Sequence, residues 1–276
     1  MYLKGQDGLK IAADSWGDHK DELVILLHGG GQTRHAWGET GPKLSKSGYH
    51  CIAIDLRGHG DSDWHPKGSY SIECYKQDLI NIIKEIGKPA SLIGASLGGM
   101  ASLSLAGDKQ NSNLCNALVM VDIGIYPDKE GSDRIVNFML SGKEGFDTLE
   151  DAAESISYFL PHRKKPKDLS GLKKNLRQKE DGRFYWHWDP NFIQGKPRSR
   201  DSGYLDLQLQ AAKRVIVPTL LIRGALSDVV TKKDVSYFLS IVTHAKFIEI
   251  DKAAHMIAGD RNDIFAQEAI NFLNTL

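Results

Sequence analysis

The sequence predicts an α/β fold, in which a mostly parallel sheet carries helices on both faces and a helical insertion interrupts the core. Short runs rich in Val, Ile and Leu alternate with segments of helical periodicity from residue 23 onward. Strands that are apolar along their whole length are buried on both faces, as in parallel sheets covered by helices. The alternation stops between about residues 128 and 212, where the chain becomes polar and helical.

Six apolar runs are expected to form the central strands. In chain order they are "ELVILLHG" (22–29), "HCIAIDLRG" (50–58), "ASLIG" (90–94), "NALVMVDIG" (116–124), "VPTLLIRG" (217–224) and "AKFIEID" (245–251). The more regularly alternating "LKIAADSWG" (9–17) indicates an antiparallel hairpin at the edge of the sheet.

The segments between these runs have helical periodicity. They are "SIECYKQDLINIIKEIG" (71–87), "LGGMASLSLAG" (97–107), "KKDVSYFLSIV" (232–242) and "IFAQEAINFLNTL" (264–276). The first has apolar residues at helical spacing and ends at Gly87, a typical stop signal. A structureless loop of some 85 residues is improbable in a compact domain, so residues 128–212 are predicted to fold as a helical cap on a core of residues 1–127 and 213–276.

Composition excludes several classes of partner. The 276 residues include 35 Lys+Arg and 35 Asp+Glu, so no net charge favours nucleic acid or an anionic membrane surface. No apolar run reaches the length of a membrane span, and the first residues do not resemble a signal peptide. Cys51, Cys74 and Cys115 form no CxxC motif, which favours a reducing compartment. A cytoplasmic location is expected, and the oligomeric state is left open.

Ser96 is the strongest candidate for a nucleophile. It lies in "GASLG" (94–98), which follows a predicted strand and opens a predicted helix, as the G-x-S-x-G nucleophile elbow requires. The turn is so tight that larger side chains two positions away would collide. The serine also sits at a helix start, beside backbone N–H groups without helical partners.

A serine hydroxyl needs a neutral imidazole as base and a carboxylate that orients it. His255 follows the last predicted strand and Asp228 follows the preceding one, so both lie at the same sheet edge as Ser96. We therefore predict a catalytic triad of Ser96, Asp228 and His255. Asp122, which follows the strand "VMV", is the alternative acid.

The glycines of "LLHGGGQ" (26–32) leave backbone N–H groups accessible after a strand. An oxyanion is stabilised by two such donors. Gly30 and Leu97 are predicted to form this oxyanion hole, with Gly31 as the alternative to Gly30. His28 is expected to brace the loop.

Together these residues resemble the α/β-hydrolase fold family. The resemblance covers the whole chain in order, through "HGGG", "DLRGHGDS", "GASLGG", the cap-like insertion, "SD" and "AAH". It implies an eight-stranded sheet, and it implies that Asp55, Arg57, Gly58 and His59 support a loop. The histidine motif departs slightly from the family pattern, since Ala254 stands where glycine is common.

The resemblance implies a serine hydrolase that cleaves a small apolar carboxylic ester or lactone through an acyl-enzyme, with no metal or organic cofactor. Alternatives are a cofactor-free perhydrolase or haloperoxidase and a C–C bond hydrolase of a diketone acid. The latter needs a cationic anchor for a carboxylate, for which Arg34 and Arg57 are the candidates. A signalling protein that binds a small ligand on the same fold is a non-enzymatic alternative.

The cap is expected to cover the substrate pocket with apolar side chains. The candidate substrate-binding residues are Gly31, Trp37, Phe138, Met139, Trp186 and Trp188, with Tyr158 and Phe159 as further lining candidates. "WHWD" (186–189) has no third ligand at useful spacing, so we predict no metal site at His187 and Asp189.

Overall fold

The computed structural model describes residues 1–161, 168–194, 203–257 and 262–276. Within these residues, eight strands form one sheet in the order β1-β2-β4-β3-β5-β6-β9-β10. The strands are β1 (Tyr2–Lys4), β2 (Lys10–Trp16), β3 (Glu22–Leu27), β4 (Tyr49–Ile54), β5 (Ala90–Ala95), β6 (Cys115–Val121), β9 (Thr219–Gly224) and β10 (Lys246–Ile250). The pairs from β4 to β10 are parallel, and β1 and β2 add an antiparallel edge. The predicted fold class is confirmed.

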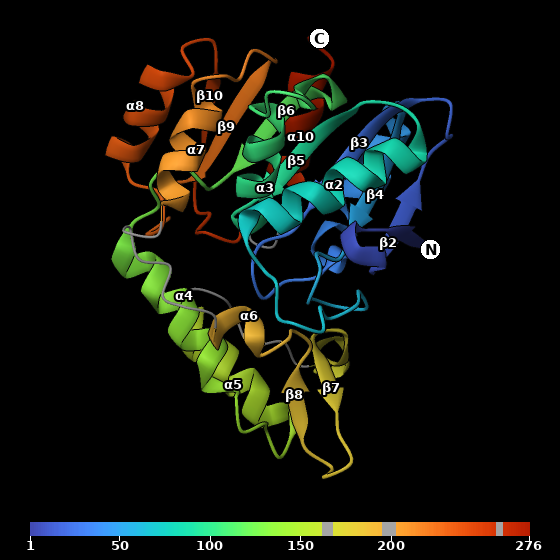
Figure 1. Cartoon of the computed structure of the whole chain (residues 1–276). Helices are drawn as coiled ribbons and strands as arrows, with labels where there is room; N and C mark the ends of the chain where they lie inside the picture. Colours follow the sequence, from blue (N-terminus) through green and yellow to red (C-terminus); the bar gives the residue numbers. More distant parts are fainter. Residues whose placement is uncertain (162–167, 195–202, 258–261) are drawn as a thin grey trace.

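Helices cover both faces of this sheet (Figure 1). One face packs against α2 (Ile72–Ile86), α3 (Leu97–Ala106), α7 (Tyr204–Ala212) and α8 (Lys232–Ile241), and the other against α1 (Thr40–Lys46) and α10 (Asn262–Leu273). The alternating side chains of β3 show why the strand is apolar throughout. Leu23 and Ile25 face the first helical layer, whereas Val24 and Leu26 face the second, and all four are buried.

Helix α2 begins after a capping serine and ends at a glycine, as its sequence predicts. The Ser71 hydroxyl accepts a hydrogen bond from the Cys74 backbone N–H at 3.3 Å, which caps the helix. Gly87 ends it in a left-handed conformation, with φ of 86°, that glycine adopts without steric cost. Between them, Tyr75 and Leu79 are among the side chains buried against the sheet.

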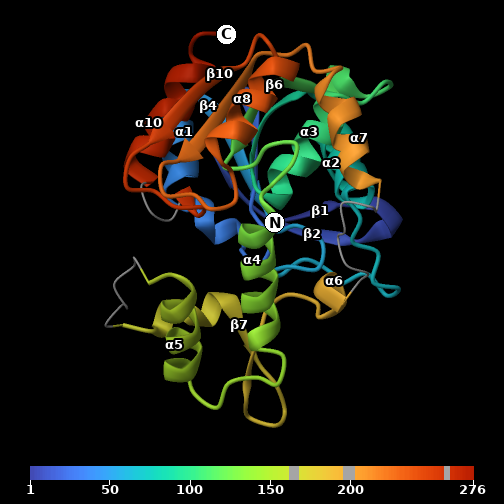
Figure 2. The same cartoon turned by 90° about the vertical axis from the view of Figure 1, so that its left-hand side faces the viewer.

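The cap extends away from the carboxyl-terminal edge of the sheet (Figures 1 and 2). It contains α4 (Lys129–Ser141), α5 (Leu149–Phe159), the antiparallel strands β7 (Leu176–Gln178) and β8 (Phe184–Trp186), and α6 (Asn191–Gln194). The insertion contains the expected helices. The sequence pattern did not predict the β7–β8 hairpin, because each of its strands has only three residues.

The last helix of the predicted insertion, α7, lies on the core and not in the cap. It packs against α3, and the Gln208 side-chain amide donates a hydrogen bond to the Ser104 hydroxyl at 2.7 Å. Among the described residues, α6 is therefore the last element of the cap, whereas the predicted insertion extends to residue 212. Among the described residues, no helix is both long enough and apolar enough to cross a lipid bilayer.

Candidate active site

Ser96 occupies a strained turn between β5 and α3. Its φ of 46° and ψ of −111° lie in a region that residues with a side chain rarely adopt. The flanking glycines are required by close packing. A Cβ at Gly94 would lie 2.5 Å from the Gly98 carbonyl oxygen, and a Cβ at Gly98 would lie 2.5 Å from the Leu27 carbonyl oxygen. The backbone therefore has the geometry expected of a nucleophile elbow.

His255 is paired with Asp122. The Nδ1 atom of His255 lies 2.8 Å from Oδ2 of Asp122, and the Asp122 side chain is completely buried. Because a carboxylate only accepts, Nδ1 carries the hydrogen and Nε2 of the neutral ring is the basic nitrogen. The side chain of His255 is 13% exposed, so its ring reaches the surface of the site.

The Asp122 carboxylate is held in place by two further donors. Its Oδ1 accepts from the Gly224 backbone N–H at 2.9 Å, and its Oδ2 also accepts from the Ser227 hydroxyl. The backbone of Asp122 has a positive φ of 49°, which turns the residue sharply at the end of β6. Such fixed partners prevent the carboxylate from rotating away from the imidazole.

The prediction that Asp228 orients His255 is wrong. Its side chain is 42% exposed, and its Oδ2 lies 2.6 Å from Nη2 of Arg134 in α4. The turn after β9 points Ser227 toward Asp122 and leaves the next residue facing the cap. Asp228 therefore joins the core to the cap, and the alternative acid, Asp122, has its place beside the imidazole.

The glycine-rich loop after β3 lies directly beside Ser96. A Cβ at Gly29 would lie 3.2 Å from the Ser96 Cβ. The Gly98 N–H donates to the His28 carbonyl at 3.1 Å, which joins the loop to the start of α3. Among the described residues, no acceptor is bonded to the backbone N–H of Gly30 or Leu97. The assignment of Gly30 and Leu97 to the oxyanion hole stays a prediction.

His28 braces this loop through both ring nitrogens, as expected. Its Nε2 accepts from the Leu56 N–H at 2.9 Å, so Nδ1 carries the hydrogen and donates to the Gly29 carbonyl at 2.7 Å. Burial lowers the pKa of His28 to about 4 despite the bond to Gly29. The ring stays neutral near pH 7, and this keeps its acceptor and donor roles fixed.

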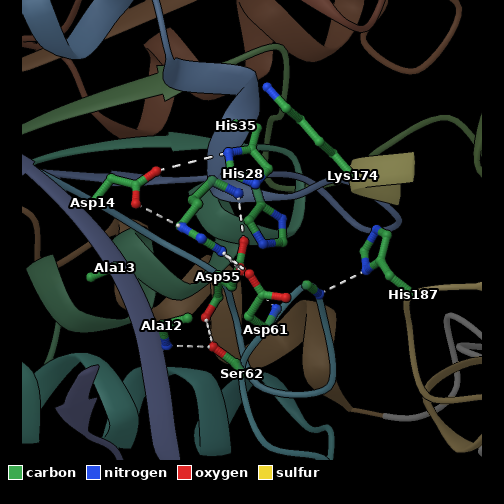
Figure 3. Close-up of polar contacts among 12 residues, drawn as sticks. Ala12, Ala13, Asp14, His28, His35, Asp55, Asp61, Ser62, Lys174 and His187 are labelled. Atoms are coloured by element: carbon green, nitrogen blue, oxygen red, sulfur yellow. Dashed lines mark hydrogen bonds and ion pairs between the residues drawn. The ribbon is translucent and has the colours of Figure 1, made fainter. Parts of the chain in front are cut away.

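The two arginines considered as carboxylate anchors are engaged elsewhere. Arg34 forms ion pairs with Asp14 and Asp61 at 3.1 and 2.9 Å and a closer one with Asp55. Figure 3 shows these three carboxylates close together. Arg57 is completely buried and forms a bidentate pair with Asp78, at 2.5 and 2.6 Å. Neither has an unpaired guanidinium for a substrate, so the hypothesis that they anchor one is wrong. Arg57 supports its loop, as the resemblance implied.

Three cap side chains lie over the glycine-rich loop. A Cβ at Gly30 would lie 3.5 Å from Cζ of Phe192, and one at Gly31 would lie 3.2 Å from Cε of Met139 and 3.4 Å from Cζ3 of Trp188. The predicted neighbours Gly31, Met139 and Trp188 are therefore together. Phe192 was missed because α6 is a single short turn, although its position just after "WHWDP" placed it near the other aromatic residues.

The remaining aromatic candidates differ in position. Trp186 stacks on Trp188, with ring centroids 5.0 Å apart, and Phe138 stacks on Phe159 within the cap at 4.2 Å. Trp37 does not face the cap, since it is buried in the core and packs against Phe265 of α10 at 5.7 Å. Tyr158 is 92% exposed. The predictions of Trp37 and Tyr158 as pocket residues are therefore wrong.

His187 connects the cap to the core. Its Nδ1 accepts from the Gly60 backbone N–H at 2.7 Å (Figure 3). Nε2 therefore carries the hydrogen that it donates to the Gly31 carbonyl at 3.4 Å. Burial, together with the neighbouring His59 and His28, lowers its pKa well below the usual value. Asp189 accepts from the Tyr70 hydroxyl. Both residues thus have structural partners, and among the described residues no cluster of three His, Cys, Asp or Glu suits a metal ion.

The sequence and fold have known relatives along nearly the whole chain. A sequence model described as the alpha/beta hydrolase fold matches residues 22–261. Esterase Rv0045c of Mycobacterium tuberculosis is 27% identical over 91% of this chain and 82% of its own. Non-heme chloroperoxidase CPO-A1 of Kitasatospora aureofaciens is 26% identical over 98% of both chains. The crystal structure of E-2-(acetamidomethylene)succinate hydrolase is similar in fold, with a TM-score of 0.85 and 19% identity over 99% of both chains.

Proposed function

This chain belongs to the alpha/beta hydrolase fold family, and we propose that it is a serine hydrolase that cleaves a carboxylic ester or lactone of a small apolar substrate. The observation that carries the proposal is the contact between His255 and the buried Asp122, at the sheet edge where Ser96 occupies its strained turn. The similarity to an esterase over most of both chains supports the same reaction.

In the proposed first half-reaction, Oγ of Ser96 attacks the ester carbonyl carbon while Nε2 of His255 accepts the hydroxyl proton. Asp122 stabilises the imidazolium that forms, as in other serine triads. The alcohol then leaves as the C–O bond breaks, and it takes the proton from His255. The product is an acyl group bound to Ser96.

In the second half-reaction, His255 removes a proton from water, whose oxygen attacks the acyl carbon and releases the acid and free Ser96. Each tetrahedral intermediate carries an oxyanion, for which we propose the N–H groups of Gly30 and Leu97 as donors. One such donor is worth roughly 3 kcal/mol of transition-state stabilisation. This chemistry needs no metal or organic cofactor.

The cap would determine which substrate reaches Ser96. We propose that the elements from α4 to α6 cover the site, with Met139, Trp188 and Phe192 forming its apolar roof above the glycine-rich loop. A mostly apolar enclosure with a few directed polar groups is typical of sites for small molecules. The three free cysteines support the proposal that the protein works in a reducing compartment, the cytoplasm.

A cofactor-free perhydrolase is the second candidate, and the similarity to a non-heme chloroperoxidase over nearly all of both chains favours it. It would share the acyl-enzyme and differ in the second step, where hydrogen peroxide replaces water and the product is a peracid. Peracid formation from acetate and hydrogen peroxide, measured beside ester hydrolysis, compares the two activities directly.

Hydrolysis of p-nitrophenyl acetate by the wild type and by Ser96→Ala tests the proposal. We expect turnover by the wild type only, and covalent labelling of the wild type at Ser96 by a fluorophosphonate, seen as a mass increase of the peptide that contains it. Equal rates for the two proteins, or no labelling, would contradict the proposed mechanism. A protein that only binds a small ligand would show neither turnover nor labelling.

A further inference from the structure

A concave feature lies on the cap, between the end of α4, the β7–β8 hairpin and α6. It is a pocket of about 80 Å³, several times the space that one water molecule needs. One wall is the stacked pair Trp186 and Trp188, and another is formed by Met139 and Leu140 of α4. Trp64, on a loop of the core, closes one side and is 44% exposed. Flat apolar walls of this kind suit a ring or a short acyl chain.

The charged groups around this pocket are all cationic. Lys143, Arg177 and Lys179 line it, and none of its lining residues is acidic. The guanidinium of Arg177 is fixed by bonds to the Gly60 carbonyl and the Asp61 carboxylate, at 2.8 and 2.7 Å. It therefore supplies little free charge of its own.

The two lysines differ from Arg177 in this respect. The Nζ of Lys179 lies 3.8 Å from the centroid of the Tyr185 ring, a contact that holds the amine without neutralising it. Among the described residues, neither the amine of Lys143 nor that of Lys179 forms a salt bridge within 4.0 Å of a carboxylate. Asp181 interacts electrostatically with Lys179 but does not line the pocket, so the charges on the lining itself are positive and favour an anionic ligand.

A buried donor adds to this preference. The indole Nε1 of Trp186 is buried and has no hydrogen-bond partner among the described residues. It lies against Gly142, which also lines the pocket, since a Cβ there would be only 2.1 Å from it. A ligand oxygen that accepted a hydrogen bond from Nε1 would satisfy this donor.

The pocket adjoins the proposed catalytic site. Met139 and Trp188 line it, and the same two side chains contact Gly31 of the glycine-rich loop. A substrate held at Ser96 can therefore extend toward the pocket only past these residues. The pocket and the proposed substrate site are thus neighbours that share one wall.

We propose that this pocket binds the far end of the substrate, and that the preferred substrates are esters whose apolar arm ends in a carboxylate. The arm packs on Trp188 and Met139, and the carboxylate lies between Lys143 and Lys179. The inference rests on the proposed function for the reaction itself, whereas the preference for an anion rests only on the pocket.

The test compares two series of p-nitrophenyl esters of six to ten carbons, with either a terminal carboxylate or a terminal methyl group. In the wild type we expect kcat/KM to be higher for the carboxylate esters of at least one length. In the double variant Lys143→Met/Lys179→Met we expect this preference to fall at least tenfold, mainly through KM.

The matched control is Lys173→Met/Lys46→Met, which removes two exposed lysines that do not line the pocket. We expect it to retain the wild-type preference. The proposal is overturned if the pocket variant keeps the preference, if no length shows one, or if the control loses as much. The last result would indicate an effect of overall charge.

Binding to the Ser96→Ala protein separates the pocket from the reaction. The intrinsic tryptophan fluorescence is titrated with monomethyl adipate and with methyl hexanoate, which differ in one terminal carboxylate. Tighter binding of monomethyl adipate that is lost in Lys143→Met/Lys179→Met supports the pocket even if no ester is hydrolysed. Equal binding of the two compounds contradicts it, even if hydrolysis is confirmed.

Discussion

Gly224, the last residue of β9, packs closely against the backbone of Ala254 in the loop that carries His255. A Cβ at position 224 would lie 2.5 Å from the carbonyl oxygens of both Ala253 and Ala254. Because β9 lies between β6 and β10 in the sheet, the loop after β10 must cross the end of β9 to bring His255 to Asp122. The absence of a side chain at Gly224 makes this crossing possible.

Gly224→Ala should therefore displace the His255 loop. We expect an overpacking cost of roughly 1–3 kcal/mol in the free energy of unfolding and a fall of at least tenfold in kcat. Urea unfolding and ester hydrolysis measure the two effects. Gly171→Ala is the matched control, since no atom lies within 4 Å of the added methyl group. A Gly224→Ala protein as active as this control would show that the loop tolerates the methyl group.

Asp122→Asn should reduce kcat by roughly 10³–10⁴-fold, because the amide can donate to Nδ1 and so favours the wrong tautomer of His255. Asp228→Asn should change kcat less than tenfold, since its carboxylate pairs with Arg134 at the surface. Steady-state kinetics with one ester compare both variants. If Asp228→Asn proves the more damaging of the two, the acid has been assigned to the wrong residue.

Ser96→Gly should abolish ester hydrolysis and stabilise the fold by about 1 kcal/mol, because glycine adopts the φ of 46° without the strain that a Cβ causes. Ser96→Ala should be equally inactive without this gain, since it keeps the Cβ. Thermal unfolding of the three proteins provides the comparison. Equal melting temperatures for the glycine and alanine variants would mean that little strain is stored in the turn.

The protein should lose stability as the pH falls below about 6.5, the pKa of an unfolded-state histidine. Burial lowers the pKa of His28 to about 4, so below 6.5 the unfolded chain binds a proton that the folded protein does not. This one residue accounts for a loss of about 3 kcal/mol by pH 4, and His187 adds to it, since its pKa is lowered in the same direction.

Urea unfolding at about pH 7 and about pH 4.5 measures this loss. His28→Gln should have a lower free energy of unfolding at neutral pH, but this free energy should fall less on acidification, because glutamine has no imidazole to protonate. Its amide oxygen can still accept a hydrogen bond from the Leu56 N–H. His19→Gln is the control, since the His19 side chain is 82% exposed. The explanation fails if His28→Gln and the wild type lose equal free energy.

Local patterns in the sequence were sufficient for the core elements and for Ser96. The strands were predictable because each must bury both of its faces, as the alternate residues of β3 do. The turn at Ser96 was predictable because a bend this sharp brings Gly94 against the Gly98 carbonyl oxygen, 2.5 Å from where a Cβ would lie. In both cases, the physical constraint acts on neighbours along the chain or on a repeated pattern.

The acid that contacts His255 could not be chosen in this way. Asp122 and Asp228 both follow parallel strands, so both satisfy the expected order along the sheet edge. The choice depended on the positive φ at Asp122, on the Ser227 hydroxyl and on the lack of a side chain at Gly224. These contacts join residues far apart in sequence, and no local pattern specifies them.

The sequence by itself thus determined the layers of the fold and the strained turn at Ser96, because backbone sterics and burial act within short segments. The tertiary structure alone decided which carboxylate forms a hydrogen bond with the imidazole of His255. It also decided which aromatic rings face the glycine-rich loop and which cations line the cap pocket. Those outcomes depend on how loops that follow separate strands pack against one another, and this packing exists only in the folded molecule.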